Sequence, residues 1–228
     1  MVSELPCLAG YFCDGGVSTP SESEGLICPR GHRCEIGSDF PTPCEAGTYQ
    51  NELGNDTCKV CPEGFYCLVN TTDPFPCIVG HYCPPMTRFA DEFPCPVSTY
   101  SNVENLRSVD ECLTCTSGSY CASPGLTAPT GLCSSGYFCG NGSSSATPHE
   151  SDPFHLSYAG ETCISPSNTT VNDLCPAGHY CLSGSSSPTP CPPGTATNAT
   201  GLSTVDDCEP CEKGSRCYYF TCLLCLWL

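Results

Sequence analysis

The most regular hydrophobic position in this chain is an aromatic residue placed directly before a cysteine. It recurs in a short pattern, C-x-x-G-x-x-C, and in six copies the residue is Phe12, Tyr66, Tyr82, Tyr120, Phe138 or Tyr180. Two further copies carry arginine instead, at Arg33 and Arg216. An aromatic ring at this place can cover the adjacent disulfide as a miniature core. The pattern therefore predicts very small modules rather than one large hydrophobic core.

A second pattern alternates polar and aromatic residues. It runs Cys-x-x-Gly-Thr-Tyr-x-Asn, with variations, and opens the three segments Cys44–Cys58, Cys95–Cys112 and Cys191–Cys208. Alternating Thr and Tyr followed by Asn predicts a short strand that enters a turn. Each segment ends in Asp-x-Cys, and we expect these aspartates to hydrogen-bond within their own turn. They are Asp56, Asp110 and Asp206.

The short pattern occurs eight times, always with a central glycine. A ring this small needs a tight turn, and glycine reaches a positive φ at little cost. The eight copies are Cys7–Cys13, Cys28–Cys34, Cys61–Cys67, Cys77–Cys83, Cys115–Cys121, Cys133–Cys139, Cys175–Cys181 and Cys211–Cys217.

The two patterns combine into a larger repeat that begins at Cys28, Cys77 and Cys175. The first interval is 49 residues and the second is twice that length, so a degenerate copy is expected between them, from about Cys133. The stretch from Gly140 to Asn172 is rich in Ser, Thr and Asn and reads as a loose linker. The expected organisation is a partial module at 1–27, repeats at 28–76 and 77–132, a degenerate repeat or linker at 133–174, a repeat at 175–217 and an apolar tail at 218–228.

Composition sharpens this picture. Cysteine supplies 25 of 228 residues, Gly and Pro together supply 45, and the net charge is −17. A cysteine content this high marks a disulfide scaffold, while the high content of Gly and Pro disfavours long helices and sheets. The predicted fold class is small and disulfide-rich: an extended array of small irregular modules with short β-hairpins and little helix.

Two independent signals indicate an extracellular location. Persistent disulfides need an oxidising compartment. The chain also holds five Asn-x-Ser/Thr sequons, which are expected to be exposed glycosylation sites. They are Asn55, Asn70, Asn141, Asn168 and Asn198. The N-terminus has no apolar signal region and the apolar stretch Tyr218–Leu228 is too short to span a bilayer, so we expect an incomplete chain, joined to a membrane only through a missing or truncated anchor.

Several functional classes find no support in the residues. Seven Lys and Arg residues without a cluster disfavour nucleic-acid binding. The C-x-x-C pairs at 58/61, 112/115 and 208/211 mark boundaries between modules, which disfavours zinc. His32, His81 and His179 share a position that elsewhere carries Phe or Ser. No EF-hand or phosphate-binding loop is present, and no catalytic constellation can be assembled, because the cysteines are expected to be oxidised. We therefore expect no enzyme activity, no cofactor and no metal site.

The two patterns together resemble a known family. Cys-Pro-x-Gly-x-Tyr-Cys, followed by Pro-Thr-Pro-Cys-x-x-Gly-Thr-Tyr-x-Asn and Asp-x-Cys-x-x-Cys, is similar to ephrin-receptor-like (GCC2/GCC3) repeats of the growth-factor-receptor cysteine-rich group. The resemblance runs from Cys7 to Cys217, and Ser98 and Ala196 depart from it. It implies a structural or protein-binding segment of a secreted or receptor-type ectodomain with an extracellular protein partner. The alternative is a soluble module that captures a growth-factor-like or cytokine-like ligand.

Cysteine spacing leaves more than one pairing open. If each opening cysteine bonds the next cysteine of its own unit, eight short rings form together with the loops 44–58, 95–112 and 191–208. This scheme assigns no partner to Cys163, Cys222 and Cys225. The alternative bridges gaps such as Cys34 to Cys44. Specific binding is expected in the longer gaps, chiefly Gly140–Ile164 and Asn51–Asp56.

Overall fold

The fold is described from a computed structural model that covers residues 7–13, 26–148 and 172–211. The chain divides into two compact bodies. The first comprises residues up to Cys95 together with Ser101–Cys112, and the second comprises Pro96–Tyr100 and the residues from Leu113 onward. Expectations for Cys163, Asn168, Cys217 and the tail 218–228 lie outside the described residues.

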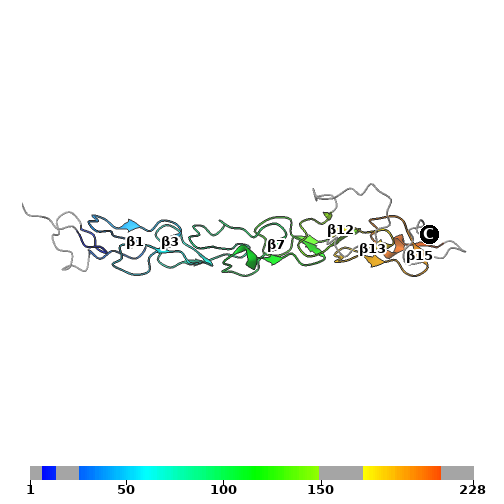
Figure 1. The fold of residues 1–228 in the computed structure, drawn as a ribbon, viewed down its shortest axis with the longest axis horizontal. Helices are drawn as coiled ribbons and strands as arrows, with labels where there is room; N and C mark the ends of the chain where they lie inside the picture. Colours follow the sequence, from blue (N-terminus) through cyan, green and yellow to red (C-terminus); the bar gives the residue numbers. More distant parts are fainter. Residues whose placement is uncertain (1–6, 14–25, 149–171, 212–228) are drawn as a thin grey trace, which may run out of the picture. The chain divides into compact units, whose positions relative to one another are not determined.

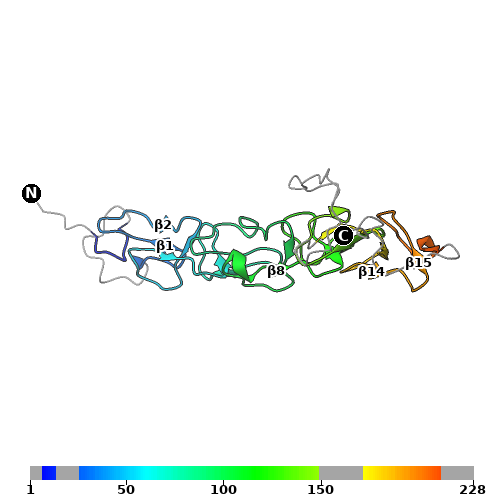
Figure 2. The same cartoon turned by 45° about the vertical axis from the view of Figure 1, so that its right-hand side comes forward.

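Secondary structure consists almost entirely of two-stranded antiparallel ladders, most of them two residues long (Figures 1 and 2). Most ladders close a local hairpin, as Figure 2 shows for β1 and β2. The described ranges also contain the short 3₁₀ turns η3 (Val109–Glu111) and η4 (Val205–Asp207) and several isolated β-bridges. In order of pairing, the strands are β1 (His32–Arg33) with β2 (Thr42–Pro43), β3 (Thr48–Tyr49) with β4 (Lys59–Val60), β5 (Phe65–Tyr66) with β6 (Phe75–Pro76), β7 (Thr99–Tyr100) with β8 (Leu113–Thr114), β9 (Ser119–Tyr120) with β10 (Gly131–Leu132), β11 (Tyr137–Cys139) with β12 (Asn172–Leu174), β13 (His179–Tyr180) with β14 (Thr189–Pro190), and β15 (Thr195–Ala196) with β16 (Glu209–Pro210).

Disulfides close these hairpins locally. Between described cysteines there are seven short rings and three longer loops, and all ten are pairs of the first scheme above. The Cα atoms of each pair lie 5.8–6.0 Å apart, which is the usual range. The pairs are 7–13, 28–34, 44–58, 61–67, 77–83, 95–112, 115–121, 133–139, 175–181 and 191–208. Cys211 is also disulfide-bonded.

The predicted class, a disulfide-rich array of short hairpins with little helix, is confirmed. The array can also be described in units shorter than the predicted repeats, each with one short ring or one longer loop. Each opening cysteine begins a unit that ends just before the next one. We number these units 1 to 10: residues 7–27, 28–43, 44–60, 61–76, 77–94, 95–114, 115–132, 133–174, 175–190 and 191–210.

The second sequence pattern is a variant of the first. In units 3, 6 and 10, the place of the ring-closing cysteine is taken by Gln50, Ser101 or Thr197, and the opening cysteine bonds a later cysteine instead. Gln50 and Ser101 are fully buried. The side-chain oxygen of each of the three accepts a hydrogen bond from the backbone N–H two residues further on. A polar turn therefore replaces the short disulfide, and it is buried in units 3 and 6.

Backbone hydrogen bonds join each unit to the next in a recurring set. Between units 8 and 9, the Gly136 N–H donates to the Cys181 carbonyl and the Cys175 N–H donates to the Gly136 carbonyl, each at 2.8 Å. The Gly184 N–H donates to the Cys133 carbonyl at 2.9 Å. Equivalent bonds recur within both bodies. They supply hydrogen-bond partners for backbone groups that the short hairpins do not pair. Neighbouring units thus stack as they do in other repeat proteins.

The central glycine of a unit also contacts the unit two places further on. A Cβ atom on Gly136 would lie 2.6 Å from the Gly201 carbonyl oxygen, and φ at Gly136 is +84°. Similar approaches under 3.0 Å join Gly10 to Gly54, Gly31 to Asn70, Gly47 to Met86, Gly64 to Asn105 and Gly118 to Gly184. Ser98 departs from the glycine pattern but keeps its backbone role: its φ is +73° and its N–H donates to the Cys121 carbonyl.

The buried apolar interior of the described residues is made of disulfides. Of 19 buried hydrophobic residues, 17 are cysteines, and the others are Leu106 and Phe138. Phe138 packs with Cys175 and Cys181, so this aromatic ring covers the disulfide of the following unit. Tyr66 stacks on Phe75 across its own hairpin, with ring centroids 5.4 Å apart.

Candidate binding site

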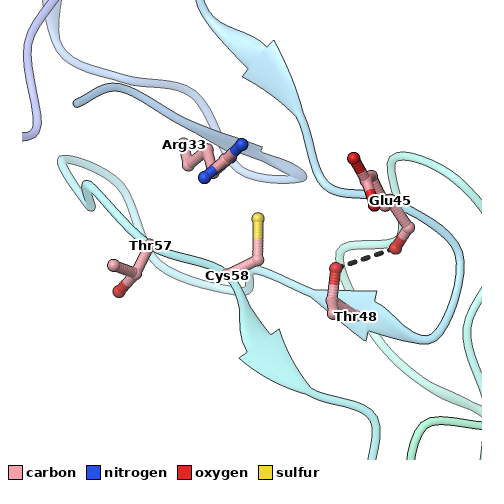
Figure 3. Close-up of a pocket in the computed structure, with 5 residues that line it drawn as sticks. All are labelled: Arg33, Glu45, Thr48, Thr57 and Cys58. Carbon is pink, nitrogen blue, oxygen red and sulfur yellow. Dashed lines mark hydrogen bonds between the residues drawn. The ribbon is translucent and has the colours of Figure 1, made fainter.

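A hollow of about 320 Å³ opens in the first body, between units 2 and 3. It is lined by Arg33, Glu45, Thr48, Thr57 and Cys58 (Figure 3). The Cys58 sulfur points toward the Arg33 side chain, while the Thr48 hydroxyl donates to the Glu45 carbonyl at 2.8 Å. Charged groups, hydroxyls and a disulfide sulfur therefore border one small space.

At the place where most units carry an aromatic residue, unit 2 carries Arg33, and its side chain borders the hollow. Phe138 occupies the equivalent place in unit 8 and covers the next disulfide. Arg33 instead donates to Glu35 at 2.6 Å, and its side chain is more than one-third exposed. The guanidinium is thus drawn toward solvent, and the next disulfide, at Cys58, is left bordering the hollow.

Acidic groups dominate the charge of the described residues. Four of the described basic side chains form ion pairs with glutamates: Arg33 with Glu35, Lys59 with Glu52, Arg88 with Glu92 and Arg107 with Glu63. All four pairs lie in the first body. These exposed pairs contribute little stability individually. They occupy most of the described basic side chains, so the remaining acidic groups leave the surface negatively charged.

The described sequon asparagines lie at the surface to different degrees. Asn70, Asn141 and Asn198 are exposed, and Asn55 is half-buried. The Asn141 side-chain oxygen accepts hydrogen bonds from the Ser117 backbone N–H and hydroxyl, at 3.2 and 2.9 Å. All four follow the ring-closing position of their unit by one to five residues, and so fall in the same turn of the repeat.

Large apolar side chains are exposed mainly on the first body. In three consecutive units, the residue before a positive-φ turn residue is aliphatic and exposed: Ile36 at 68%, Leu53 at 59% and Val69 at 60%. Leu53 lies within the predicted binding gap Asn51–Asp56. The other predicted gap, Gly140–Ile164, is described only as far as residue 148.

The three histidines at equivalent positions have a common local contact. The Nδ1 atoms of His32, His81 and His179 lie 3.1–3.2 Å from the carbonyl oxygen two residues earlier in the chain. A carbonyl can only accept, so each Nδ1 carries the proton. Among the described residues, no group of three or more His, Cys, Asp or Glu side chains is arranged to hold a metal ion.

The carboxylates that bond their own turns differ from those expected. Glu111 accepts from the Arg107 N–H at 2.7 Å, and Asp207 accepts from the Thr204 and Ser203 N–H groups. Each lies one residue beyond the predicted aspartate, Asp110 or Asp206. The bonds from Thr204 and Ser203 lower the pKa of Asp207. The reason is geometric, because the 3₁₀ turn places its third residue, not its second, over its first N–H groups.

Glu92 supports a pH prediction. Its carboxylate accepts two hydrogen bonds from the Arg88 side chain and one from the Arg88 N–H, and the side-chain bonds are the main cause of its lowered pKa. A lowered folded pKa means that this clamp contributes stability above the ordinary glutamate pKa and loses it as the pH falls through the lowered value. We expect an NMR titration of the Glu92 carboxyl to show a midpoint below the ordinary range, with the Arg88 and Phe89 amides shifting together.

In Glu92→Gln, those amides should no longer shift over that pH interval, because the titrating group is gone. A Glu92 midpoint at or above the ordinary glutamate value would contradict the clamp.

Comparison with known families agrees with this architecture. Residues 37–73 match the family model described as tyrosine-protein kinase ephrin type A/B receptor-like. The match includes all of unit 3 and therefore four of the five residues that line the hollow. No curated protein matches the sequence. Within the described ranges, no helix is both long and apolar enough to cross a membrane. The chain thus carries an ephrin-receptor-like module within a cysteine-rich repeat array.

Proposed function

We propose that this chain is a non-catalytic, protein-binding segment of a secreted or receptor-type ectodomain, glycosylated at its sequons. The ephrin-receptor-like module and the disulfide core support an extracellular location. The exposed aliphatic residues of the first body carry the binding proposal. Single exposed apolar side chains are common on protein surfaces, but their recurrence at one position in three consecutive units offers a partner a regular set of apolar contacts.

The partner class follows from the surface chemistry. Ile36 and Leu53 are each preceded by a glutamate, Glu35 and Glu52. Both glutamates already pair with Arg33 and Lys59, so the case for a basic partner rests on the net charge of −17, because charge complementarity steers association. A partner that covers Ile36 and Leu53 also needs apolar side chains at its centre. We therefore infer an extracellular protein with a basic, partly apolar surface.

A capture experiment tests this proposal. The variant Ile36→Ser/Leu53→Ser/Val69→Ser is expected to lose at least tenfold in capture of extracellular proteins, since each buried aliphatic side chain contributes about 1.5–3 kcal/mol. The control variant Leu132→Ser/Leu182→Ser removes two exposed leucines of the second body and should retain capture.

Specific capture that is equal for both variants would contradict the proposed face, and no specific capture at all would favour a spacer. A diffusible partner captured from culture medium, rather than a cell-surface protein, would favour the alternative of a ligand-capturing module.

A further inference from the structure

We propose that the Cys44–Cys58 disulfide is a site of exchange with low-molecular-weight thiols, which approach through the hollow and form a mixed disulfide on Cys58. Such a site needs a sulfur that a reagent can reach, a path to that sulfur, and a surrounding unit that stays closed when the bond opens. The proposal concerns chemistry at a disulfide of this chain and does not depend on the proposed protein binding.

The described disulfides differ in how well their sulfurs are covered. In the short rings of units 2, 4, 5, 7, 8 and 9, both cysteines are at most 1% exposed. Cys44 is also fully buried, but Cys58 is half-buried. Cys13 and Cys112 are half-buried as well, but Cys58 is the half-cystine that lines the hollow. Because access limits thiol–disulfide exchange, we expect attack on this bond from the Cys58 side.

The hollow provides the path. Its volume of about 320 Å³ suits a small reagent, and the Cys58 sulfur points toward Arg33 (Figure 3). The attacking species is a thiolate, so the positive charge of the Arg33 guanidinium favours its approach. Glu35 pairs with this guanidinium and Glu45 borders the hollow. Arg33 is therefore the group that offsets two carboxylates along the path.

Unit 3 has other bonds that hold its loop when the disulfide opens. The buried Gln50 side chain donates from Nε2 to the Thr57 carbonyl at 2.8 Å, and so joins the two ends of the loop directly. The ladder of β3 with β4 lies next to this bond. The Gly54 N–H donates to the Cys28 carbonyl at 2.9 Å, which anchors the loop to unit 2. We therefore expect the exchange to stay local.

The exchange step needs no further reactant. The thiolate attacks the Cys58 sulfur, and a new S–S bond forms between the reagent and Cys58. The Cys44–Cys58 bond breaks, and its electron pair leaves with the Cys44 sulfur, which takes a proton from water. The reagent sulfur is oxidised and the Cys44 sulfur is reduced. Attack by Cys44 on the mixed disulfide restores the native bond, so the modification is reversible.

The test treats the full oxidised chain with millimolar cysteine under native conditions. The reaction is quenched with acid, free thiols are alkylated in denaturant, and each cysteine is mapped by mass spectrometry. We expect a cysteine adduct on Cys58 and an alkylated Cys44. This pair should react about tenfold faster or more than the matched control, the buried ring Cys61–Cys67 of the next unit. Amides of β3 and β4 should stay dispersed in the NMR spectrum of the adduct.

A charge variant tests the path. Arg33→Gln leaves Glu35 and Glu45 without the cation between them, so exchange at Cys58 should slow about threefold or more at low salt. Arg30→Gln removes an exposed arginine of the same unit that does not line the hollow, and it should leave the rate unchanged. The inference would be overturned by an adduct on Cys44, by a buried ring that exchanges as fast as this pair, by loss of the β3–β4 ladder in the adduct, or by equal rates in the two arginine variants.

Discussion

Reduction of the disulfides is expected to unfold the entire array. After treatment with a thiol reductant and alkylation of the freed thiols, the chain should lose all of its strand pairs. Its amide NMR spectrum should collapse to the narrow dispersion of an unfolded chain. This is the largest effect that we expect from any single treatment of this protein.

The physical reason is the composition of the interior. Almost all of the buried apolar residues among those described are half-cystines, so no aliphatic core remains to hold the hairpins once the bonds are broken. Each short ring contributes roughly 2–3 kcal/mol in the chain-entropy model. A two-stranded ladder of two residues is unstable in water without such a closure.

The control for this experiment is the oxidised chain treated with the alkylating reagent alone, which should keep its dispersed spectrum. Dispersed amides that persist in the reduced and alkylated chain would contradict a disulfide core. They would place the stability in the backbone bonds between units instead.

The cysteine patterns predict much of this fold. The ring size follows from the spacing of six between paired cysteines such as Cys61 and Cys67, and the strand at Thr48–Tyr49 follows from the alternation around it. Residue type does not show that Gln50 is the counterpart of a ring-closing cysteine. The spacing does show it, because Cys44, Gly47 and Gln50 are spaced as in the short ring.

The hollow was harder to predict. Arginine at position 33, in place of an aromatic residue, is visible in the sequence. The position of the hollow is not, because that depends on which disulfide the side chain faces. Phe138 faces the disulfide of the following unit, whereas Tyr66 at the equivalent position stacks on Phe75 across its own hairpin. The Phe138 contact is set by the stacking of units through backbone bonds, which cysteine spacing does not encode.

The sequence predicts one reason for glycine at the central position of a unit, and the structure shows a second. A tight turn explains the positive φ of Gly136. The approach of the Gly201 carbonyl adds a steric reason that involves the unit two places away. Ser98 shows that the turn alone does not require glycine, because it adopts a similar positive φ with a side chain present. The second reason yields a prediction with a large effect.

Substitution of Gly136 by alanine is expected to destabilise the second body by about 3 kcal/mol or more. The new methyl group would lie 2.6 Å from the Gly201 carbonyl oxygen and 3.3 Å from its carbon. Neither side can easily move away. The Gly136 N–H is bonded to the Cys181 carbonyl at 2.8 Å, and the Gly201 N–H is bonded to the Cys175 carbonyl at 2.7 Å.

The matched control is Gly142→Ala, in the same unit. Gly142 has a similar φ of +75°, but an added methyl group would meet the Thr114 Cγ2 atom at an ordinary 3.5 Å. Its cost should be that of the left-handed backbone alone, about 1–2 kcal/mol. Guanidinium unfolding with the disulfides intact measures both variants, and the difference between them reports the close approach between units 8 and 10. Equal losses for the two variants would mean that the Gly201 turn shifts freely, so that units two places apart do not support each other.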